Sequence, residues 1–358
     1  GYLGCLLCVG TRAGSPGKGS RGKGGAPLIT EISLRDYEQV AVAVPGSAIF
    51  ADCTEAVLAG DPCWRDQLRY GVDRWVARFE RQLVIHSEGH HGLAVGDVNG
   101  DGYADFFFGY YHAEVEGWSS PGYSGVFWGI LGSASPNSSY DLDAGEFDFK
   151  VYGTPDSYGL GARAATGDLD GDGYDELILQ VSDSPHGAVA VIAGAADFGG
   201  GGDIDSVTDS SGSYPVNQGL GGLATGDFNG DGPDDLAIGN PFASPESRSS
   251  AGETYLFTGG DDLLTGSYDA TTESDLLIRG AEEGDYFGFQ IAMGDLNGDG
   301  LDDVAVAVAF GAQPRLLLRD ATSGRFVDET SRLPKMKINS NSVGWGDLDG
   351  DGDLDLVF

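Results

Sequence analysis

A nine-residue acidic motif occurs five times in this chain, and its repetition limits the folds that the chain can adopt. The motif reads D-x-[DN]-x-D-G-x-x-[DE], follows a glycine each time, and begins at residues 97, 168, 227, 295 and 347. Oxygen-bearing side chains stand at positions 1, 3, 5 and 9, and the glycine at position 6 permits a sharp turn. Calcium takes about six to eight oxygen ligands, which include backbone carbonyls. The five copies therefore predict five calcium-binding loops rather than five solvated acidic turns.

The predicted ligands are the side chains at the four oxygen positions and the backbone carbonyl at position 7. They are Asp97, Asn99, Asp101, Tyr103 and Asp105 in the first motif, and Asp168, Asp170, Asp172, Tyr174 and Glu176 in the second. The third and fourth motifs supply Asp227, Asn229, Asp231, Pro233 and Asp235, then Asp295, Asn297, Asp299, Leu301 and Asp303. The fifth motif supplies Asp347, Asp349, Asp351, Asp353 and Asp355.

The residues around each motif distinguish this pattern from an EF-hand. An EF-hand loop ends in a bidentate glutamate at position 12 and lies between two helices. Position 12 is apolar in every copy, namely Phe108, Leu179, Ile238, Val306 and Phe358. Short apolar runs precede and follow the motifs, as is typical of buried strands. Each motif is therefore expected to join two strands of a hairpin.

The spacing of the motifs predicts the architecture. Successive motifs start 71, 59, 68 and 52 residues apart, which leaves room for four short strands in each unit. Repeats of this kind are typical of propeller blades. In the third unit, the third and fourth strands are expected at residues 252–257 and 275–278. The predicted fold is all-β, a β-propeller of four-stranded blades with calcium-binding loops between strands A and B, incomplete at the C-terminus.

The stretch 284–303 has a Phe-Gly pair at Phe287 and Gly288 followed by a calcium motif, and it resembles the FG-GAP repeat of integrin-α-like propellers. The last two units are also similar to VCBS-type repeats. The resemblance covers roughly residues 86–358 and implies that the loops joining strands B to C and D to A form a ligand-binding face, opposite the calcium loops. Aromatic side chains on these loops are the candidate ligand contacts, unless they pack between blades: Tyr110, Tyr111, Trp118, Tyr158, Phe242 and Tyr286.

The N-terminal quarter of the chain does not carry the repeat. Residues 1–27 are expected to be the remnant of a secretory signal and a flexible linker. Residues 28–85 are expected to form a small cap or a degenerate blade, with apolar spacing from Trp64 to Leu83 that suggests a helix. Residues 86–358 then form the propeller repeats, truncated in the last blade. Cys53 and Cys63 are either disulfide-bonded or buried thiols.

Three alternating polar residues, His86, Glu88 and His90, precede the first motif. On an extended strand they would share one side and could bind a transition metal. Their spacing differs from the helical H-E-x-x-H pattern of zinc proteases. We therefore favour a polar loop that leads into the first motif.

The chain has 20 basic and 56 acidic residues, a formal net charge of −36. Such a surface repels nucleic acid and anionic lipid, so neither is expected as a partner. The apolar stretch at residues 2–9 is too short to cross a bilayer, so no transmembrane segment is predicted. The expected location is extracellular or at the cell surface.

Three functions are consistent with these features. The favoured one is a non-catalytic, calcium-binding adhesion module for a protein or carbohydrate ligand, because the sequence contains no nucleophile elbow and no nucleotide-binding glycine loop. The second is the propeller of an extracellular polysaccharide-active enzyme, since a pair of catalytic carboxylates could lie among so many acidic residues. The third is a purely structural repeat.

Overall fold

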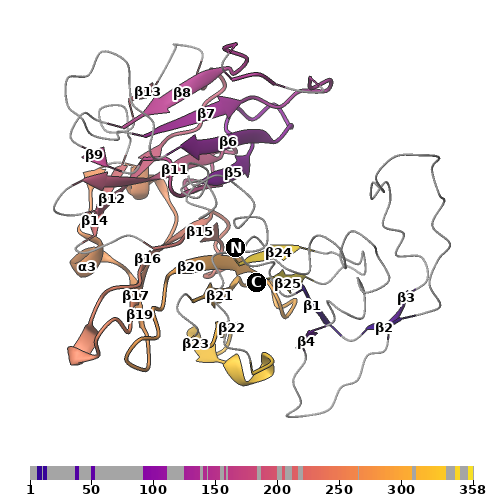
Figure 1. Cartoon of the computed structure of the whole chain (residues 1–358), viewed down its shortest axis with the longest axis vertical. Coiled ribbons are helices and arrows are strands. Elements are labelled where there is room, and N and C mark those ends of the chain that lie inside the picture. The colour runs from indigo at the N-terminus through magenta and orange to yellow at the C-terminus, as the bar shows by residue number, and fades with distance from the viewer. Residues whose placement is uncertain are drawn as a thin grey trace, which may run out of the picture. The chain divides into compact units, whose positions relative to one another are not determined.

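The chain divides into two compact units, His90–Met293 and a second unit that combines Gly1–Gly89 with Gly294–Phe358 (Figure 1). The computed structural model describes residues 92–110, 125–137, 140–142, 144–153, 157–158, 160–183, 187–199, 204–205, 212–216, 221–264, 266–308, 312–335, 343–346 and 354–357. It also describes four strands nearer the N-terminus, namely β1 (Leu6–Val9), β2 (Thr11–Ala13), β3 (Tyr37–Gln39) and β4 (Phe50–Asp52).

The unit His90–Met293 contains three antiparallel blades that follow one another along the chain. The first blade consists of β5 (Leu93–Gly96), β6 (Asp105–Tyr110), β7 (Val126–Ile130) and β8 (Phe149–Tyr152), with β13 (Ile204–Asp205) parallel to β8. The second consists of β10 (Ala164–Gly167), β11 (Glu176–Asp183), β12 (Gly187–Ile192) and β14 (Gly212–Val216), extended by β9 (Ser157–Tyr158) and β18 (Gly266–Ser267). The third consists of β15 (Leu223–Gly226), β16 (Asp235–Asn240), β17 (Glu253–Phe257) and β19 (Leu276–Arg279).

The other unit contains the remaining repeats. One sheet has the order β20 (Gln290–Gly294), β21 (Asp303–Ala307), β22 (Arg315–Asp320) and β23 (Arg325–Asp328), and the division between the units falls within β20. Another sheet has the order β24 (Gly344–Gly346), β25 (Asp355–Val357), β1 and β4. This sheet therefore combines strands from both ends of the chain.

Helix is scarce among the described residues. The named helices are the 3₁₀ turns η3 (Pro245–Ser247), η4 (Asp261–Leu264) and η5 (Thr330–Arg332), and the single-turn α3 (Ala270–Glu273). The predicted all-β fold with four-stranded blades is confirmed. The helix expected between Trp64 and Leu83 lies outside the described residues.

The acidic motifs lie in hairpins with one shared register. The glycine before the motif pairs with the acidic residue at position 9, as Gly96 with Asp105 and Gly167 with Glu176. The third and fifth motifs repeat this pairing at Gly226 and Gly346. The prediction of strand–loop–strand hairpins, and the exclusion of an EF-hand, are therefore confirmed.

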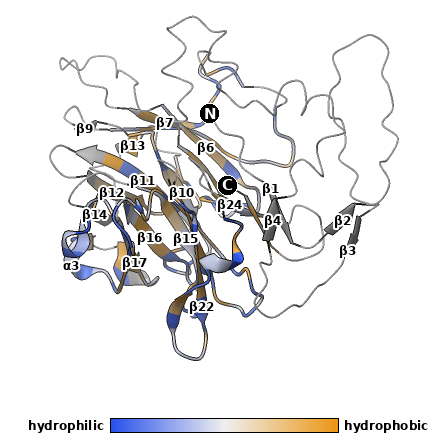
Figure 2. Cartoon of the chain, turned by 60° about the horizontal axis from the view of Figure 1, so that its bottom comes forward, coloured by the Kyte–Doolittle hydropathy of each residue, from blue (hydrophilic) through white to orange (hydrophobic). Residues whose placement is uncertain are grey.

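Buried apolar side chains form one cluster from the first and second blades and another from the second and third blades. Figure 2 shows hydrophobic residues along the strands of these blades. Phe107, Phe127 and Phe149 of the first blade pack against Leu177 and Leu179 of the second. Because successive side chains of a strand point to opposite faces, β11 uses Ile178 on its other face, toward the third blade. Strand β11 is apolar on both faces because it lies between two blades.

Threonine hydroxyls connect the first strands of the three blades. Thr166 Oγ1 donates to the Val95 carbonyl at 2.8 Å, and Thr225 Oγ1 donates to the Thr166 carbonyl at 2.7 Å. These bonds link neighbouring blades at β5, β10 and β15, the strands that the first three acidic motifs follow.

Candidate metal centres and the loop face

The four motifs that the structure describes fold into the same loop. In each one the position 1 carboxylate accepts a hydrogen bond from the position 6 glycine N–H, at 2.8 to 3.0 Å, from Gly102, Gly173, Gly232 and Gly300. These glycines have φ between 84° and 113°. The residue at position 4 is also a glycine with positive φ in all four loops, namely Gly100, Gly171, Gly230 and Gly298. Both positions have a left-handed backbone, which glycine adopts without steric cost, whereas the sequence predicted a turn glycine only at position 6.

The acidic residue at position 9 is buried in every described motif and attaches the loop to the blade. In the second motif, the Glu176 carboxylate accepts from the Leu169 N–H at 2.7 Å and from the Gly194 N–H at 3.1 Å. Asp105, Asp235 and Asp303 accept an equivalent pair of backbone hydrogen bonds. Position 9 therefore connects strand B, the start of the loop and strand C.

The second motif brings three carboxylates into one cluster. Single oxygens of Asp168, Asp170 and Glu176 all lie within 4.8 Å of one another. Asp170 Oδ1 accepts a hydrogen bond from the Asp172 N–H at 3.0 Å. A cluster of carboxylate oxygens on a tight loop matches the oxygen-rich coordination of a hard divalent cation, so the donor set is suited to calcium.

The third motif differs at position 3, where an amide replaces the carboxylate. The Asn229 amide nitrogen donates to Asp231 at 2.9 Å and to Asp235 at 3.3 Å. A cation at this centre would have to replace these two contacts. The third motif also has one carboxylate fewer than the second, and the number of charged ligands is one of the factors that set calcium affinity.

Burial perturbs the acids at position 9. Burial, with a smaller contribution from nearby carboxylates of the same loop, raises the pKa of Glu176 and of Asp235 to about 7 and that of Asp303 to about 6, although their backbone hydrogen bonds act in the opposite direction. Burial also raises the pKa of Asp105. No arginine or lysine of the described residues forms an ion pair with the carboxylate at position 1, so the local negative charge is available to a cation.

A second acidic residue connects neighbouring motifs. Asp175, at position 8, accepts a hydrogen bond from the Asp97 N–H at 2.8 Å and donates its own N–H to the Asp97 carbonyl at 3.0 Å. The Asp234 N–H likewise donates to the Asp168 carbonyl at 2.8 Å. Sequence reasoning overlooked this position, although an aspartate recurs there at 175, 234 and 302.

Several predicted sites lie outside the described residues. They include the fifth motif from Asp347 to Asp353, the group His86, Glu88 and His90, and Cys53 with Cys63. Tyr111 and Trp118 also lie outside them. These assignments remain predictions.

The loops that join strands B to C and D to A, the predicted ligand-binding face, bring aromatic residues together at the third blade. Phe242, on the loop between β16 and β17, is 43% exposed and meets Tyr286 edge-on at 6.0 Å between ring centroids. Tyr286 lies on the turn between β19 and β20 and has a positive φ of 48°. Tyr110 is half-buried at the end of β6, and Tyr158 lies in β9. The structure therefore brings together two of the six predicted contacts, from the two predicted loops.

The hairpins, the repeated acidic loops and the four-stranded blades define a repeat protein of the propeller class. Residues 91–125 and 221–257 match the FG-GAP repeat, and residues 295–358 match the FG-GAP-like repeat. The chain therefore contains FG-GAP and FG-GAP-like repeats, and it is similar in sequence to integrin alpha proteins.

Curated relatives support this assignment. The chain is 26% identical over 221 residues to integrin alpha-5 of Xenopus laevis, which covers 56% of this chain and 20% of the relative. It is 30% identical over 148 residues to phosphatidylinositol-glycan-specific phospholipase D of Rattus norvegicus, covering 38% of this chain and 18% of the relative. The chain thus spans about a fifth of the length of these relatives.

Among solved structures, a rhamnogalacturonan lyase of Bacillus licheniformis aligns with a TM-score of 0.41 and 14% identity, covering 74% of this chain and 46% of the lyase. That score is too low to carry an argument about function. Within the described part of the chain, no helix has the length and apolar character needed to cross a membrane.

Proposed function

We propose that this chain is a secreted or cell-surface binding module in which calcium stabilises the blades and the opposite loops contact a protein or glycan. The observation that carries the proposal is the repeated acidic loop, assembled most completely at Asp168, Asp170 and Glu176. Integrin alpha-5 and phosphatidylinositol-glycan-specific phospholipase D, to which the chain is similar, support an extracellular or cell-surface location.

Calcium would act mainly on stability in this proposal. Each motif holds three or four acidic side chains close together, and their mutual repulsion disfavours the loop unless a cation is bound. With ~1 mM calcium and a dissociation constant of ~0.1 mM, one ion stabilises the folded chain by about 1.4 kcal/mol. Several such ions would contribute an amount comparable to the stability of an ordinary domain.

The experiment is a calorimetric titration of chelator-treated protein with calcium, where we expect about five ions per chain. Asp168→Asn should lower the number of ions by one or weaken one site, whereas Glu283→Gln, which removes an exposed acid outside the motifs, should leave the titration unchanged. Failure of the wild-type chain to bind any calcium would overturn the metal assignment.

The binding role needs a separate assay. The calcium-loaded chain is applied to arrays of glycans and of extracellular proteins, and saturable binding to at least one member is expected. Calcium binding without any ligand would leave the third function, a structural repeat, as the better description.

An enzyme-associated role is the second candidate. The observation that favours it is the similarity to a phospholipase D specific for phosphatidylinositol glycans, of which this chain covers 18%. In this alternative the propeller is one part of a larger extracellular enzyme that acts on a glycan-containing substrate. Sequencing the complete gene tests it, because the alternative requires a catalytic domain on the same chain.

A further inference from the structure

A small polar cavity lies in the third blade, away from the calcium loops. Its volume is about 310 Å³, which is at the lower end of the ~300–1,000 Å³ range of small-molecule sites. The residues that line it are Asn240, Ala243, Ser244, Pro245, Glu253, Tyr255 and Thr271. They come from the end of β16, the following loop with η3, the first half of β17, and α3.

The polar groups of the cavity are held in place by one another. Asn240 and Tyr255 are buried, at 1% and 2% exposure. The Tyr255 hydroxyl donates to Glu253 Oε2 at 2.9 Å, and Arg279 Nε donates to Glu253 Oε1 at 3.2 Å. Burial raises the pKa of Tyr255, so its hydroxyl remains protonated. Asn240 also hydrogen-bonds the Tyr255 side chain.

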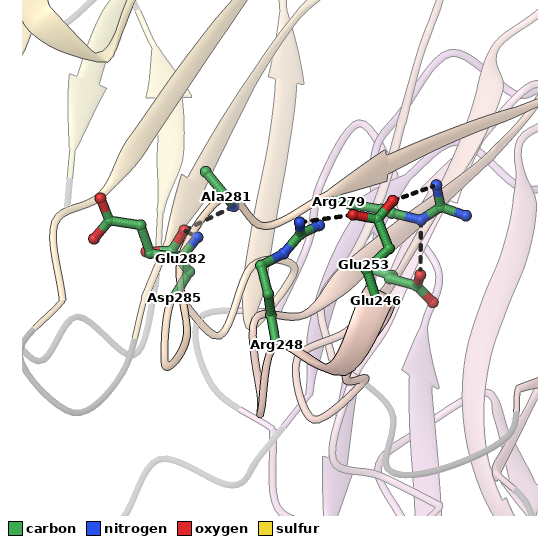
Figure 3. A network of polar contacts seen from close by, with 7 residues as sticks. All are labelled: Glu246, Arg248, Glu253, Arg279, Ala281, Glu282 and Asp285. Carbon is green, nitrogen blue, oxygen red and sulfur yellow. Dashed lines mark hydrogen bonds and ion pairs between the residues drawn. The ribbon is translucent and has the colours of Figure 1, made fainter.

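The charges beside the cavity compensate one another (Figure 3). Arg279 pairs with Glu253 at 3.2 Å and with Glu246 at 3.8 Å, and Arg248 pairs with Glu246 at 2.9 Å. Two arginines therefore balance two glutamates. Both arginines beside the cavity already pair with glutamates, and the net charge of the chain is −36, so an anionic ligand is disfavoured here. A metal ion would find a single carboxylate in the lining, that of Glu253, and this carboxylate is already paired with Arg279.

The loop that forms one wall is rigidly attached to the neighbouring turn. The carbonyls of Ser249, Ser250 and Ala251 accept hydrogen bonds from the N–H groups of Gly284, Tyr286 and Phe287, at 2.9 to 3.0 Å. Asp285 closes that turn by accepting from the Ala281 and Glu282 N–H groups (Figure 3). The wall is therefore formed before a ligand arrives, which lowers the entropic cost of binding.

The same two segments store backbone strain. Among the described residues, the non-glycine residues with positive φ are Glu246, Ser247, Ser250 and Tyr286, and all four lie on this loop and this turn. Such conformations cost on the order of 1–3 kcal/mol each and concentrate at binding sites. Two independent observations, a polar cavity and clustered strain, thus point to the same end of the third blade.

We infer that this cavity binds one neutral sugar unit, held by hydrogen bonds from its hydroxyls to Asn240, Glu253, Tyr255 and the hydroxyls of Ser244 and Thr271. The Asn240 amide and the Ser244 hydroxyl can donate as well as accept. The Tyr255 and Thr271 hydroxyls already donate to Glu253 and Asp269, so their oxygens serve as acceptors, as does the Glu253 carboxylate. The lining thus offers a polyol both donors and acceptors. Ala243 and Pro245 supply the apolar part of the lining. The inference rests on the proposed binding function and gives it a ligand class and a location.

The test uses the full chain in calcium and measures binding of D-glucose, D-galactose and D-mannose by saturation-transfer NMR, with D-galacturonate as the anionic comparison. At least one neutral sugar should bind saturably, and D-galacturonate should bind more weakly. Tyr255→Phe should weaken that sugar about tenfold, because it removes one hydroxyl from the cavity. Tyr214→Phe is the matched control, since the Tyr214 hydroxyl is also buried but donates to the Leu263 carbonyl outside the cavity.

A second pair of variants tests the cavity by filling it. Ser244→Phe places a ring at the lining and should abolish sugar binding, whereas Ser249→Phe, on the same loop but outside the lining, should not. Melting temperatures of both variants establish that they fold. Undiminished binding in Tyr255→Phe and Ser244→Phe would overturn this cavity while leaving a glycan-binding function in place elsewhere. Absence of binding by all three neutral sugars would overturn the ligand class, and the array experiment would then decide separately whether the binding function survives.

Discussion

Glu176 should couple the stability of this protein to both pH and calcium. Its side chain is 1% exposed, and burial raises its pKa from an ordinary value of 4.5 to about 7. Between these two values the folded chain binds a proton that the unfolded chain has already lost. The contribution of Glu176 to stability is therefore fully present below about pH 4.5 and is lost as the pH rises through about 7.

The size of this effect follows from the two pKa values. Between about pH 5 and pH 8, ionisation of Glu176 should remove about 2–3 kcal/mol from the free energy of unfolding of the calcium-free protein. Glu176→Gln cannot ionise, so its pH dependence should be smaller than that of the wild type by this amount. The glutamine lowers stability at every pH because its NH₂ group faces a backbone donor, and for that reason the slope is the useful measurement.

The assay is urea unfolding at a series of pH values, with chelator and then with saturating calcium. Calcium favours the ionised carboxylate, so the wild type should lose less stability with rising pH when calcium is present. Asp235→Asn should reproduce the flattening, because burial also raises the pKa of Asp235 to about 7. Identical slopes for the wild type and both variants in chelator would refute the reasoning.

Three further predictions concern other parts of the chain. Asp175→Ala should destabilise the protein by about 1–2 kcal/mol in chemical denaturation, because the Asp175 carboxylate accepts a hydrogen bond from the Asp97 N–H. The same substitution should weaken calcium binding at the first motif more than at the second, and equal weakening at both motifs would contradict the contact between Asp175 and the first motif. Asp299→Ala should lower the calcium-dependent part of the melting temperature, because it removes a central ligand of the fourth motif; an unchanged shift on chelation would argue against that centre. Phe242→Ala should weaken ligand binding without changing calcium stoichiometry, because the ring is exposed beside Tyr286; unaltered binding, measured on the arrays, would move the contact surface elsewhere.

The sequence alone predicted the elements whose interactions are local. Each acidic motif carries its predicted ligands and its turn glycines within nine residues, so the spacing was sufficient to predict the loops and the flanking strands. The strands expected at 252–257 and 275–278 correspond to β17 and β19, shifted by one residue at three of their four ends. Residues 177–179 were predicted as a buried strand because they form an apolar run.

Only the tertiary structure decided which distant residues meet. Asp175 and Asp97 are separated by 78 residues, and Arg279 and Glu253 by 26, so no local pattern indicates either hydrogen bond. The polar cavity likewise forms where the end of β16, the start of β17 and α3 converge. The spacing of apolar residues along a strand predicts which face of the strand is buried. Which residues pack against that face depends on how the blades stack. The position and the turn geometry of the acidic loops could therefore be predicted from the sequence, whereas the links between blades and the polar cavity required the fold.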